Sequence, residues 1–233
     1  MISFITPAHN EEFLIGETLA ILRASAESLK RPFEIIVAAD ACTDRTAAIA
    51  REQGAIVIEI DRRQIAAVRN AGAKIARGDI FVFVDADTHV QPETLQAAMR
   101  ALDGGAVGGG GRLRVDEASP RWGRWTFRLI SSTIRLMRWS AGCFFFVRRD
   151  AFDAVGGFDE RYFITEEIVL SKALKKRGRM EIVGPPVITS GRKTRMYSMG
   201  EFSKLLWHFA ILGDDYLQKR EHFGIWYDGK REQ

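Results

Sequence analysis

Apolar residues in the first hundred positions form short unbroken runs, and longer amphipathic stretches separate these runs. The clearest runs are Phe33 to Ala38, in which Glu34 is the one polar residue, and Ile80 to Val84, and both are apolar at successive positions rather than at alternate ones. Strands of this kind are typical of parallel sheets whose two faces are both covered by helices. The pattern therefore predicts an α/β fold with a mostly parallel central sheet flanked by helices. Further strands are expected over 2–5 and 55–60, and helices over 11–29, 45–53, 64–76 and 92–102.

The pattern becomes irregular after Gly104. A glycine-rich strand precedes a basic and aromatic helix over 121–139, a strand over 142–148 and a helix over 166–177. Because no low-complexity linker divides the chain, we interpret residues 1–233 as a single domain with halves 1–103 and 104–233.

The charges are distributed unevenly along the chain. Residues 1–117 carry 13 Lys+Arg and 17 Asp+Glu, a net charge of −4, and residues 118–233 carry a net charge of +8. An acidic first part suits a cation, and a basic second part suits an anionic partner.

Two carboxylates follow the strand at 80–84. Ligands of open parallel sheets bind beyond the carboxyl ends of the strands, which places the loops 6–11, 39–44 and 85–89 along one edge. Asp85 and Asp87 lie in the last of these loops. Carboxylate oxygens suit Mg²⁺ or Mn²⁺ held jointly with substrate phosphates. An acidic pair that stands alone is more typical of a solvated turn or a helix cap, so this pair by itself does not identify a metal site.

Other motifs accompany the acidic pair along residues 1–178. They are Pro7–Glu12, Glu34–Asp44, Arg69–Gly72, Ala76–Asp79, Phe83–Asp87, Gly156–Glu160 and Glu166–Leu170. Their order and spacing resemble those of family 2 glycosyltransferases, which have the GT-A fold. The resemblance implies that residues 1–103 bind a nucleotide-diphospho-sugar and that residues 104–233, with C-terminal helices, form the acceptor half.

The resemblance also implies roles for individual residues. Asp40 would face the nucleotide base, and Arg69 would close the nucleotide pocket. Asp87 would contact the metal, Mn²⁺ or Mg²⁺, and Asp85 the ribose or the metal. The other residues expected to line the donor site are Pro7, Ala8, Asn10, Glu11 and Ala86. From the residues alone, Asn10 is expected to cap the first helix, and capping is the alternative role for Asp40.

Glu166 and Glu167 are the candidate catalytic pair. The family usually has Glu-Asp here, and its second acid takes the proton of the acceptor hydroxyl, which implies that Glu167 is the base. The alternative is that both acids are surface charges at the start of a helix. The Gln-x-x-Arg-Trp motif of processive synthases is absent, which favours the addition of one sugar per visit.

Several further features leave two interpretations open. The basic segment Ser190 to Arg195 either folds over the diphosphate, with Arg195 on the donor, or is a solvated loop. His9 and His208 are either metal ligands or ordinary surface histidines. The glycines at 108–111 lack the Lys of a P-loop, so we expect a strand that passes close to the donor sugar.

The helix expected at 121–139 is strongly amphipathic. Five arginines fall within one arc of about 100°, and most of the apolar residues lie opposite them. Such a helix either lies on an anionic membrane, which would suit a lipid-linked acceptor, or packs on the sheet with a solvated basic face.

No apolar run approaches the ~20 residues of a membrane span, and two cysteines make no disulfide framework. We therefore expect a cytoplasmic protein. The amphipathic helix at 121–139 keeps peripheral attachment to the inner face of the membrane as an alternative. No nucleic-acid partner is expected.

Together these observations predict a metal-dependent transferase that moves a sugar, with UDP-sugar as the preferred donor, onto the hydroxyl of a small-molecule or lipid-linked acceptor. Inversion by direct displacement is favoured over retention. A sugar-nucleotide or membrane-surface binding module is the alternative outside catalysis. No G-x-G-x-x-G follows the first strand, so a nicotinamide oxidoreductase is not expected.

Overall fold

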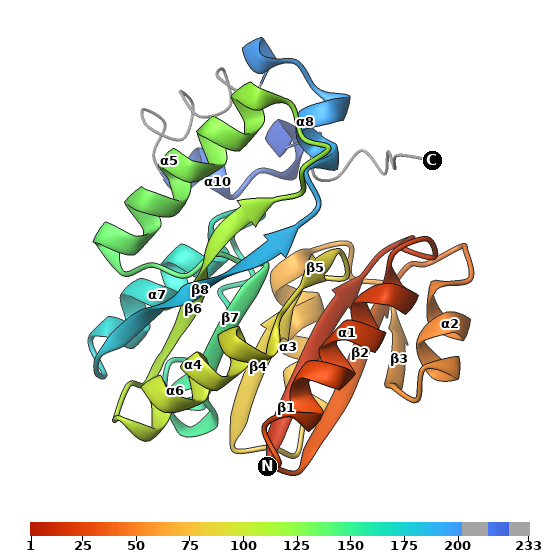
Figure 1. Ribbon diagram of the computed structural model, residues 1–233. Helices are drawn as coiled ribbons and strands as arrows, with labels where there is room; N and C mark the ends of the chain where they lie inside the picture. Colours follow the sequence, from red (N-terminus) through yellow and green to blue (C-terminus); the bar gives the residue numbers. More distant parts are fainter. Residues whose placement is uncertain (202–213, 224–233) are drawn as a thin grey trace.

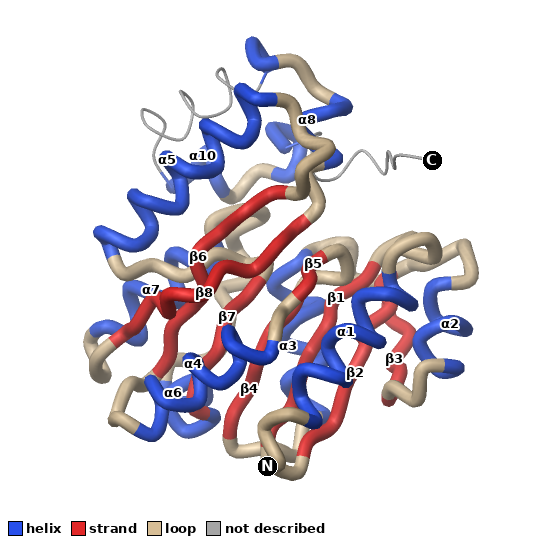
Figure 2. The backbone as a smooth tube through the Cα atoms, viewed as in Figure 1, coloured by secondary structure: helices blue, strands red, loops and turns tan. Residues whose placement is uncertain are grey.

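The computed structural model describes residues 1–201 and 214–223, which form one mixed sheet with helices on both faces (Figures 1 and 2). The strands are β1 Ile2–Ala8, β2 Phe33–Asp40, β3 Ile56–Ile60, β4 Ile80–Val84, β5 Thr88–His89, β6 Gly108–Val115, β7 Phe144–Arg148 and β8 Met180–Thr189. The helices are α1 Ile15–Glu27, α2 Thr46–Glu52, α3 Ile65–Ile75, α4 Pro92–Asp103, α5 Arg121–Met137, α6 Arg149–Ala154, α7 Glu166–Lys175, α8 Arg192–Met196 and α10 Asp214–Leu217, followed by the 3₁₀ helix Arg220–Phe223.

The strand order within the described residues is β3-β2-β1-β4-β7-β6-β8-β5. Strands β3, β2, β1 and β4 are parallel to one another, and β6 is parallel to β8. Strand β7 is antiparallel to both β4 and β6, and β5 is antiparallel to β8. The expected α/β fold is confirmed, with a sheet that is mixed rather than uniformly parallel.

Both faces of the sheet carry a hydrophobic core, as the doubly apolar strands predicted. Phe4 points into the core under α1 and α4, whereas its neighbour Ile5 points into the core under α3, α6 and α7. Figure 1 shows α1 and α4 on one side of the sheet and α3 on the other. Alternate residues of one strand therefore pack into two cores. This two-sided burial fixes the orientation of the strand ends and of the loops that follow them.

The first helix begins later than the sequence predicted. Helix α1 starts at Ile15 instead of Glu11, and Asn10 has a left-handed backbone (φ 51°), so the expected cap is wrong. The reason lies in the loop that follows β2. The side-chain oxygen of Asn10 accepts the N–H of Thr43 at 2.8 Å, and the N–H of Glu11 donates to the hydroxyl of Thr46 at 2.8 Å. Residues 10–12 thus join two loops and do not extend the helix.

The glycine run is explained by packing inside the sheet. Residues 108–111 belong to β6, between β7 and β8. A Cβ at Gly109 would lie 1.8 Å from the carbonyl oxygen of Glu181, and one at Gly110 would lie 2.1 Å from the hydroxyl of Ser140. The glycines are needed for these close approaches. The expected proximity of this strand to a donor sugar remains a prediction.

Helix α5 divides its apolar residues between two faces. Ile130 and Ile134 pack against the core, and the hydroxyl of Ser131 accepts the N–H of Leu113 on β6 at 3.0 Å. The apolar arc of the helix therefore has a part that packs on the core and a part that is exposed. Trp125, Leu129 and Leu136 are 73%, 65% and 81% exposed. Within the described part of the chain, no helix is long and apolar enough to cross a membrane.

Candidate functional site

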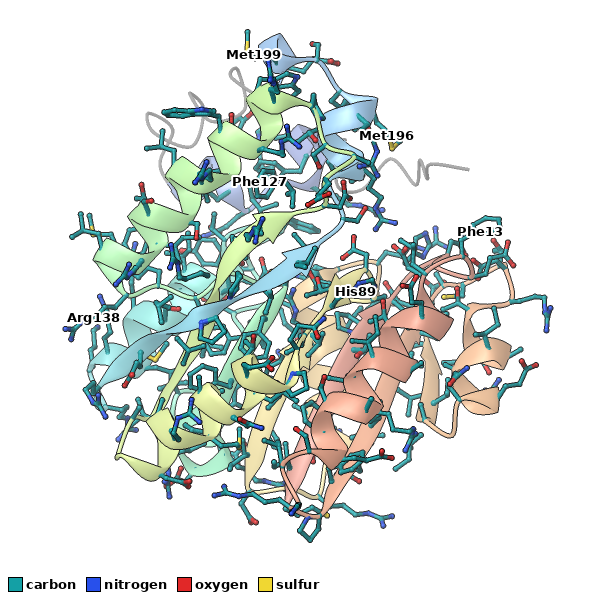
Figure 3. The ribbon with its side chains drawn as sticks, viewed as in Figure 1. Phe13, His89, Phe127, Arg138, Met196 and Met199 are labelled. Atoms are coloured by element: carbon teal, nitrogen blue, oxygen red, sulfur yellow. The ribbon has the colours of Figure 1, made fainter. Side chains whose placement is uncertain are left out.

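The loops of both halves of the chain meet at one edge of the sheet. The carboxyl ends of β1, β2 and β4 lie there because these strands are parallel. The pairing of β5 with β8 brings in the second half, since Thr88 lies opposite Thr189 and the N–H of Ser190 donates to the carbonyl of Asp87 at 3.1 Å. Figure 3 labels His89 of β5 in this central region.

Arg192 of α8 holds Glu11 and Asp87 together. Its Nη1 and Nη2 donate to the two oxygens of Glu11, each at 2.6 Å, and Nη2 lies 3.2 Å from Oδ2 of Asp87. The three side chains are only 13%, 7% and 14% exposed. Burial raises the pKa of Asp87 to about 6, with Arg192 opposing the rise and Asp85 adding to it.

Arg69 of α3 is a second, fully buried hub. Its Nη2 donates to Oδ1 of Asp85 at 2.9 Å and to the carbonyl of Gly142 at 3.1 Å, and its Nη1 donates to Oε1 of Glu166 at 2.5 Å. A Cβ at position 142 would lie 2.6 Å from Nη2, so this approach requires glycine. Although burial disfavours its charge, Asp85 and Glu166 raise the pKa of Arg69 above its ordinary value. Arg69 therefore links the acidic loop after β4 to the start of α7.

Glu166 and Glu167 open α7 beside this arginine. The side chain of Glu166 is 4% exposed, and Glu167 is half-buried. Burial raises the pKa of Glu166 to about 8, with Glu167 adding to the rise and Arg69 opposing it. Burial also raises the pKa of Glu167, again opposed by Arg69. A carboxylate with a raised pKa is a better proton acceptor near neutral pH, which suits Glu167 to take a proton from a bound hydroxyl.

The rest of the Arg69–Gly72 motif fixes the segment that leads to α7. Asn70 accepts the N–H of Phe158 at 3.0 Å and donates to the carbonyl of Phe158 at 2.9 Å. A Cβ at Gly72 would lie 2.5 Å from Cγ2 of Ile5, so glycine lets α3 lie close to β1. Two neighbours of Arg69 therefore hold the elements that Arg69 connects.

Asp40 lies at the end of β2 and holds the loop that follows β3. Its two oxygens accept the N–H groups of Arg62 and Arg63 at 2.6 and 2.8 Å, and the residue is 6% exposed. The proposed contact of Asp40 with a nucleotide base remains a prediction. Nδ1 of His9 lies 2.6 Å from the carbonyl oxygen of Asp40, which directs His9 toward β2. His208 lies outside the described residues.

The remaining predicted residues contribute mainly through the backbone. Pro7 and Ala8 end β1 in register with Ala38 and Ala39 of β2. The carbonyl oxygen of Ala86 accepts the hydroxyl of Thr18 at 2.8 Å, which ties the acidic loop to α1. These residues shape the edge of the sheet between Asp40 and Asp87.

Within the basic segment, sequence reasoning selected Arg195, whereas Arg192 contacts the site carboxylates. Nη1 of Arg195 donates to Oδ1 of Asp116 at 2.8 Å. Although burial acts to raise the pKa of Asp116, hydrogen bonds from the N–H of Gly191 and from Arg195 lower it overall. No signal in the sequence separates two arginines three residues apart, because the choice depends on where Asp116 and Glu11 lie.

The carboxylates of Asp85 and Asp87 fit a shared divalent cation. They offer hard oxygen ligands at the exit of one strand, and the side chain of Asp85 is 31% exposed. Across the described ranges 1–201 and 214–223, no group of three or more His, Cys, Asp or Glu side chains could hold a metal alone. The cation would therefore need oxygens from a ligand, as Mg²⁺ and Mn²⁺ sites built on substrate phosphates do.

Known proteins resemble this chain in sequence and in fold. A model of glycosyl transferase family 2 matches residues 3–158. The undecaprenyl-phosphate 4-deoxy-4-formamido-L-arabinose transferase of Pseudomonas paraeruginosa (strain DSM 24068 / PA7) is 32% identical over 144 residues, which cover 58% of this chain and 42% of that protein. The chain thus spans less than half the length of this curated relative.

Two solved structures share the fold. The mannosyltransferase PcManGT from Pyrobaculum calidifontis, in complex with GDP-Man and Mn²⁺, has a TM-score of 0.65 at 22% identity and covers 90% of this chain and 63% of its own. Glucosyl-3-phosphoglycerate synthase from Mycobacterium tuberculosis, in complex with Mn²⁺, UDP and phosphoglyceric acid, has a TM-score of 0.56 at 19% identity, with coverages of 80% and 68%. At these identities the likeness establishes the GT-A fold alone.

Proposed function

The chain belongs to glycosyl transferase family 2, and we propose that it is a glycosyltransferase that moves a sugar from a UDP-sugar onto a lipid-linked acceptor with inversion at C1. The observation that carries the proposal is the buried contact of Arg69 with both Asp85 and Glu166. Through this one residue, the acidic pair after β4 and the Glu166–Glu167 pair are held at the same edge of the sheet. A donor-binding group and a base must be this close for a direct displacement.

On this proposal, Asp85 and Asp87 hold a divalent cation together with the diphosphate. The cation supplies electrostatic stabilisation for the departing diphosphate. Arg69 keeps Asp85 oriented, and Glu167 accepts the proton of the acceptor hydroxyl. Each oxygen of Asp40 accepts one N–H and has a further lone pair, so Asp40 can also accept an N–H of uracil.

Thermal unfolding in the presence of nucleotides tests the donor site. UDP, GDP, CDP and dTDP are compared with and without Mn²⁺. A diphosphate at ~100 times its dissociation constant adds about 2.7 kcal/mol, which corresponds to a shift of roughly 5–11 °C for a chain of this size. The shift should be largest for UDP, should need Mn²⁺ and should disappear in Asp87→Asn. If no diphosphate stabilises the parent protein, the proposed donor site is wrong.

The exposed face of α5 supports an acceptor that is presented at a membrane. Trp125, Leu129 and Leu136 lie on the outside of this helix, and Arg121, Arg124, Arg128 and Arg135 are exposed beside them. Apolar side chains that enter the headgroup region, flanked by arginines that meet anionic lipid, are typical of interfacial helices. The relative from Pseudomonas paraeruginosa is named for transfer to undecaprenyl phosphate, which also favours a lipid-linked acceptor.

Vesicle flotation tests this surface. The protein should float with vesicles rich in anionic phosphatidylglycerol and less with neutral ones, and Trp125→Glu should abolish flotation. Phe13→Glu is the matched control, because Phe13 is an aromatic residue of the turn before α1, away from α5, and its 75% exposure is close to the 73% of Trp125. Equal flotation of Trp125→Glu and the parent would contradict the membrane contact.

A second candidate is that the acceptor atom is a polyprenyl phosphate oxygen, as the name of that relative suggests. A phosphate monoester is already largely ionised at neutral pH, so it needs no base. Turnover by Glu167→Gln separates the two candidates. Near-parental turnover would favour a phosphate acceptor, and a large loss would favour a hydroxyl acceptor.

A further inference from the structure

Arg192 contacts two carboxylates of the candidate site at the same time. Its guanidinium makes a two-pronged contact with Glu11 and also reaches Oδ2 of Asp87 at 3.2 Å. Glu11 follows β1, Asp87 follows β4 and Arg192 follows β8, so one side chain joins three loops. The oxygen of Asp87 that faces Arg192 is among those that a divalent cation would use.

The backbone around Arg192 is fixed by contacts that do not involve its side chain. The N–H of Gly191 donates to Oδ2 of Asp116 at 2.7 Å, and the hydroxyl of Thr194 donates to the carbonyl of Gly191 at 2.7 Å. A Cβ at Gly191 would lie 1.7 Å from the hydroxyl of Ser119, and one at Gly123 of α5 would lie 2.9 Å from Thr194. A change in the partners of the Arg192 side chain would therefore leave these contacts of α8 in place.

The charges of the site give a reason for such a change. With a divalent cation on Asp87, the cation and the guanidinium would both be positive and would claim the same carboxylate. A nucleotide diphosphate beside them would present phosphate oxygens, and the planar fork of arginine matches phosphate as well as it matches the carboxylate of Glu11.

We propose that Arg192 exchanges partners during the catalytic cycle: it neutralises Glu11 and Asp87 before the donor binds, and it turns to the diphosphate when a divalent cation takes Asp87. The inference rests on the proposed function, because it requires that a nucleotide diphosphate and a cation bind at this edge. It goes further because it gives Arg192 two opposite effects on binding. Arg192 weakens the binding of the metal alone and strengthens the joint binding of the metal and the nucleotide.

Two binding constants of Arg192→Gln test the exchange. Binding of Mn²⁺ alone is followed by the electron paramagnetic resonance signal of free Mn²⁺, and binding of UDP at saturating Mn²⁺ by calorimetry. Arg192→Gln should bind Mn²⁺ alone several-fold more tightly, because Asp87 is released. The same variant should bind UDP roughly tenfold or more weakly, because the charge-assisted contact with phosphate is lost. If UDP does not bind and another diphosphate stabilises the parent, that diphosphate is used instead.

Lys193→Gln is the matched control, since it removes one positive charge from the same helix. The amine of Lys193 lies 5.8 Å from the ring centroid of Tyr197, and both affinities should stay within about twofold of the parent. Arg192→Lys keeps a charge near Glu11 but loses the fork, so it should fold as the parent does and show smaller changes of the same two signs. Unfolding curves of every variant identify any that fails to fold.

Unchanged or weaker Mn²⁺ binding by both Arg192 variants would overturn the exchange, even if UDP binding fell. A parent protein that binds UDP with Mn²⁺ would in that case leave the proposed function intact. A parent protein that binds no diphosphate at all would remove the proposed function, and this inference with it.

Discussion

Replacement of Arg69 by methionine tests whether the buried network organises the site. Methionine has a similar length and no charge, so Arg69→Met leaves Asp85 and Glu166 without their shared cation while much of the packing volume is kept. The guanidinium is buried and contacts both carboxylates, at 2.9 and 2.5 Å. Removal of one partner from such a buried pair costs about 3–5 kcal/mol, because a charge remains uncompensated.

The cost should depend on pH in a defined direction. Burial already raises the pKa of Glu166 to about 8, and Arg69 opposes that rise. Loss of Arg69 moves the folded-state pKa of Glu166 further above its unfolded value. Stability contributed by such a raised group is present at low pH and is lost as the pH rises through the folded-state pKa. The difference between Arg69→Met and the parent should therefore be larger at about pH 9 than at about pH 6.

Urea unfolding at these two pH values measures the change in the free energy of unfolding, and thermal unfolding measures the corresponding change in Tm. At about pH 9 the loss of 3–5 kcal/mol corresponds to a decrease of roughly 6–20 °C in Tm. Arg31→Met is the control, because Arg31 pairs with Asp103 at 2.7 Å but the two side chains are 41% and 55% exposed. An exposed pair of this kind contributes about 0–1 kcal/mol.

A second substitution separates charge from packing. Glu166→Gln added to Arg69→Met removes one of the two orphaned carboxylates and should recover part of the lost stability at about pH 9. If Arg69→Met costs no more than Arg31→Met, or if Glu166→Gln recovers nothing, the network does not stabilise the fold as argued.

Three further predictions follow from the site and the sheet. With a hydroxyl acceptor, Glu167→Gln should lower kcat by about 10²–10⁴ at unchanged UDP affinity. In the parent protein, the acidic limb of the pH–rate profile should lie above the pKa range of an ordinary glutamate, because burial raises the pKa of Glu167. Gly109→Ala should destabilise the protein by about 1–3 kcal/mol or more in urea unfolding, since its methyl group would lie 1.8 Å from the carbonyl oxygen of Glu181, whereas Gly184→Ala, with nothing within 4 Å, should cost far less. Removal of divalent cations with EDTA should abolish both turnover and stabilisation by UDP, and added Mn²⁺ should restore them; turnover that persists in EDTA would contradict the assigned role of Asp85 and Asp87.

The strands and their two-faced burial could be predicted because hydrophobic periodicity is a local property. Ile80 to Val84 is apolar throughout, and the strand it forms is buried. The start of α1 could not be predicted in the same way. Its expected first residues are instead engaged by Thr43 and Thr46, which lie more than thirty positions away. A local sequence pattern contains no information on a hydrogen bond from a distant loop that competes with the helix.

The same limit applies to helix α5. Its helical wheel shows a basic arc and an apolar arc, but the residues it buries are those that face the sheet, where the hydroxyl of Ser131 accepts the N–H of Leu113 on β6. Ile130 and Ile134 pack against the core, whereas Trp125 is exposed. The amphipathic wheel therefore predicted the helix, but it contains no information on what the helix packs against and could not show which apolar residues are buried.

The roles of the two arginines depend on the same kind of distant contact. Arg69 was identified only through a resemblance, as a residue that closes a nucleotide pocket, yet its partners lie 16 and 97 positions away. Arg192 and Arg195 look equivalent in the sequence, and the position of Asp116 separates them. Charge type can thus be read from the sequence, but charge pairing follows from the fold.

The balance of these pairs bears on how a donor could bind. Among the described residues, the network contains two arginines, Arg69 and Arg192, and five carboxylates: Glu11, Asp85, Asp87, Glu166 and Glu167. Even with Glu166 protonated, four carboxylates remain beside two guanidinium groups. A diphosphate that approached this edge alone would meet an excess of negative charge. A divalent cation carries two positive charges and would cancel that excess, so on the proposed function the metal and the nucleotide should bind with strong positive cooperativity rather than independently.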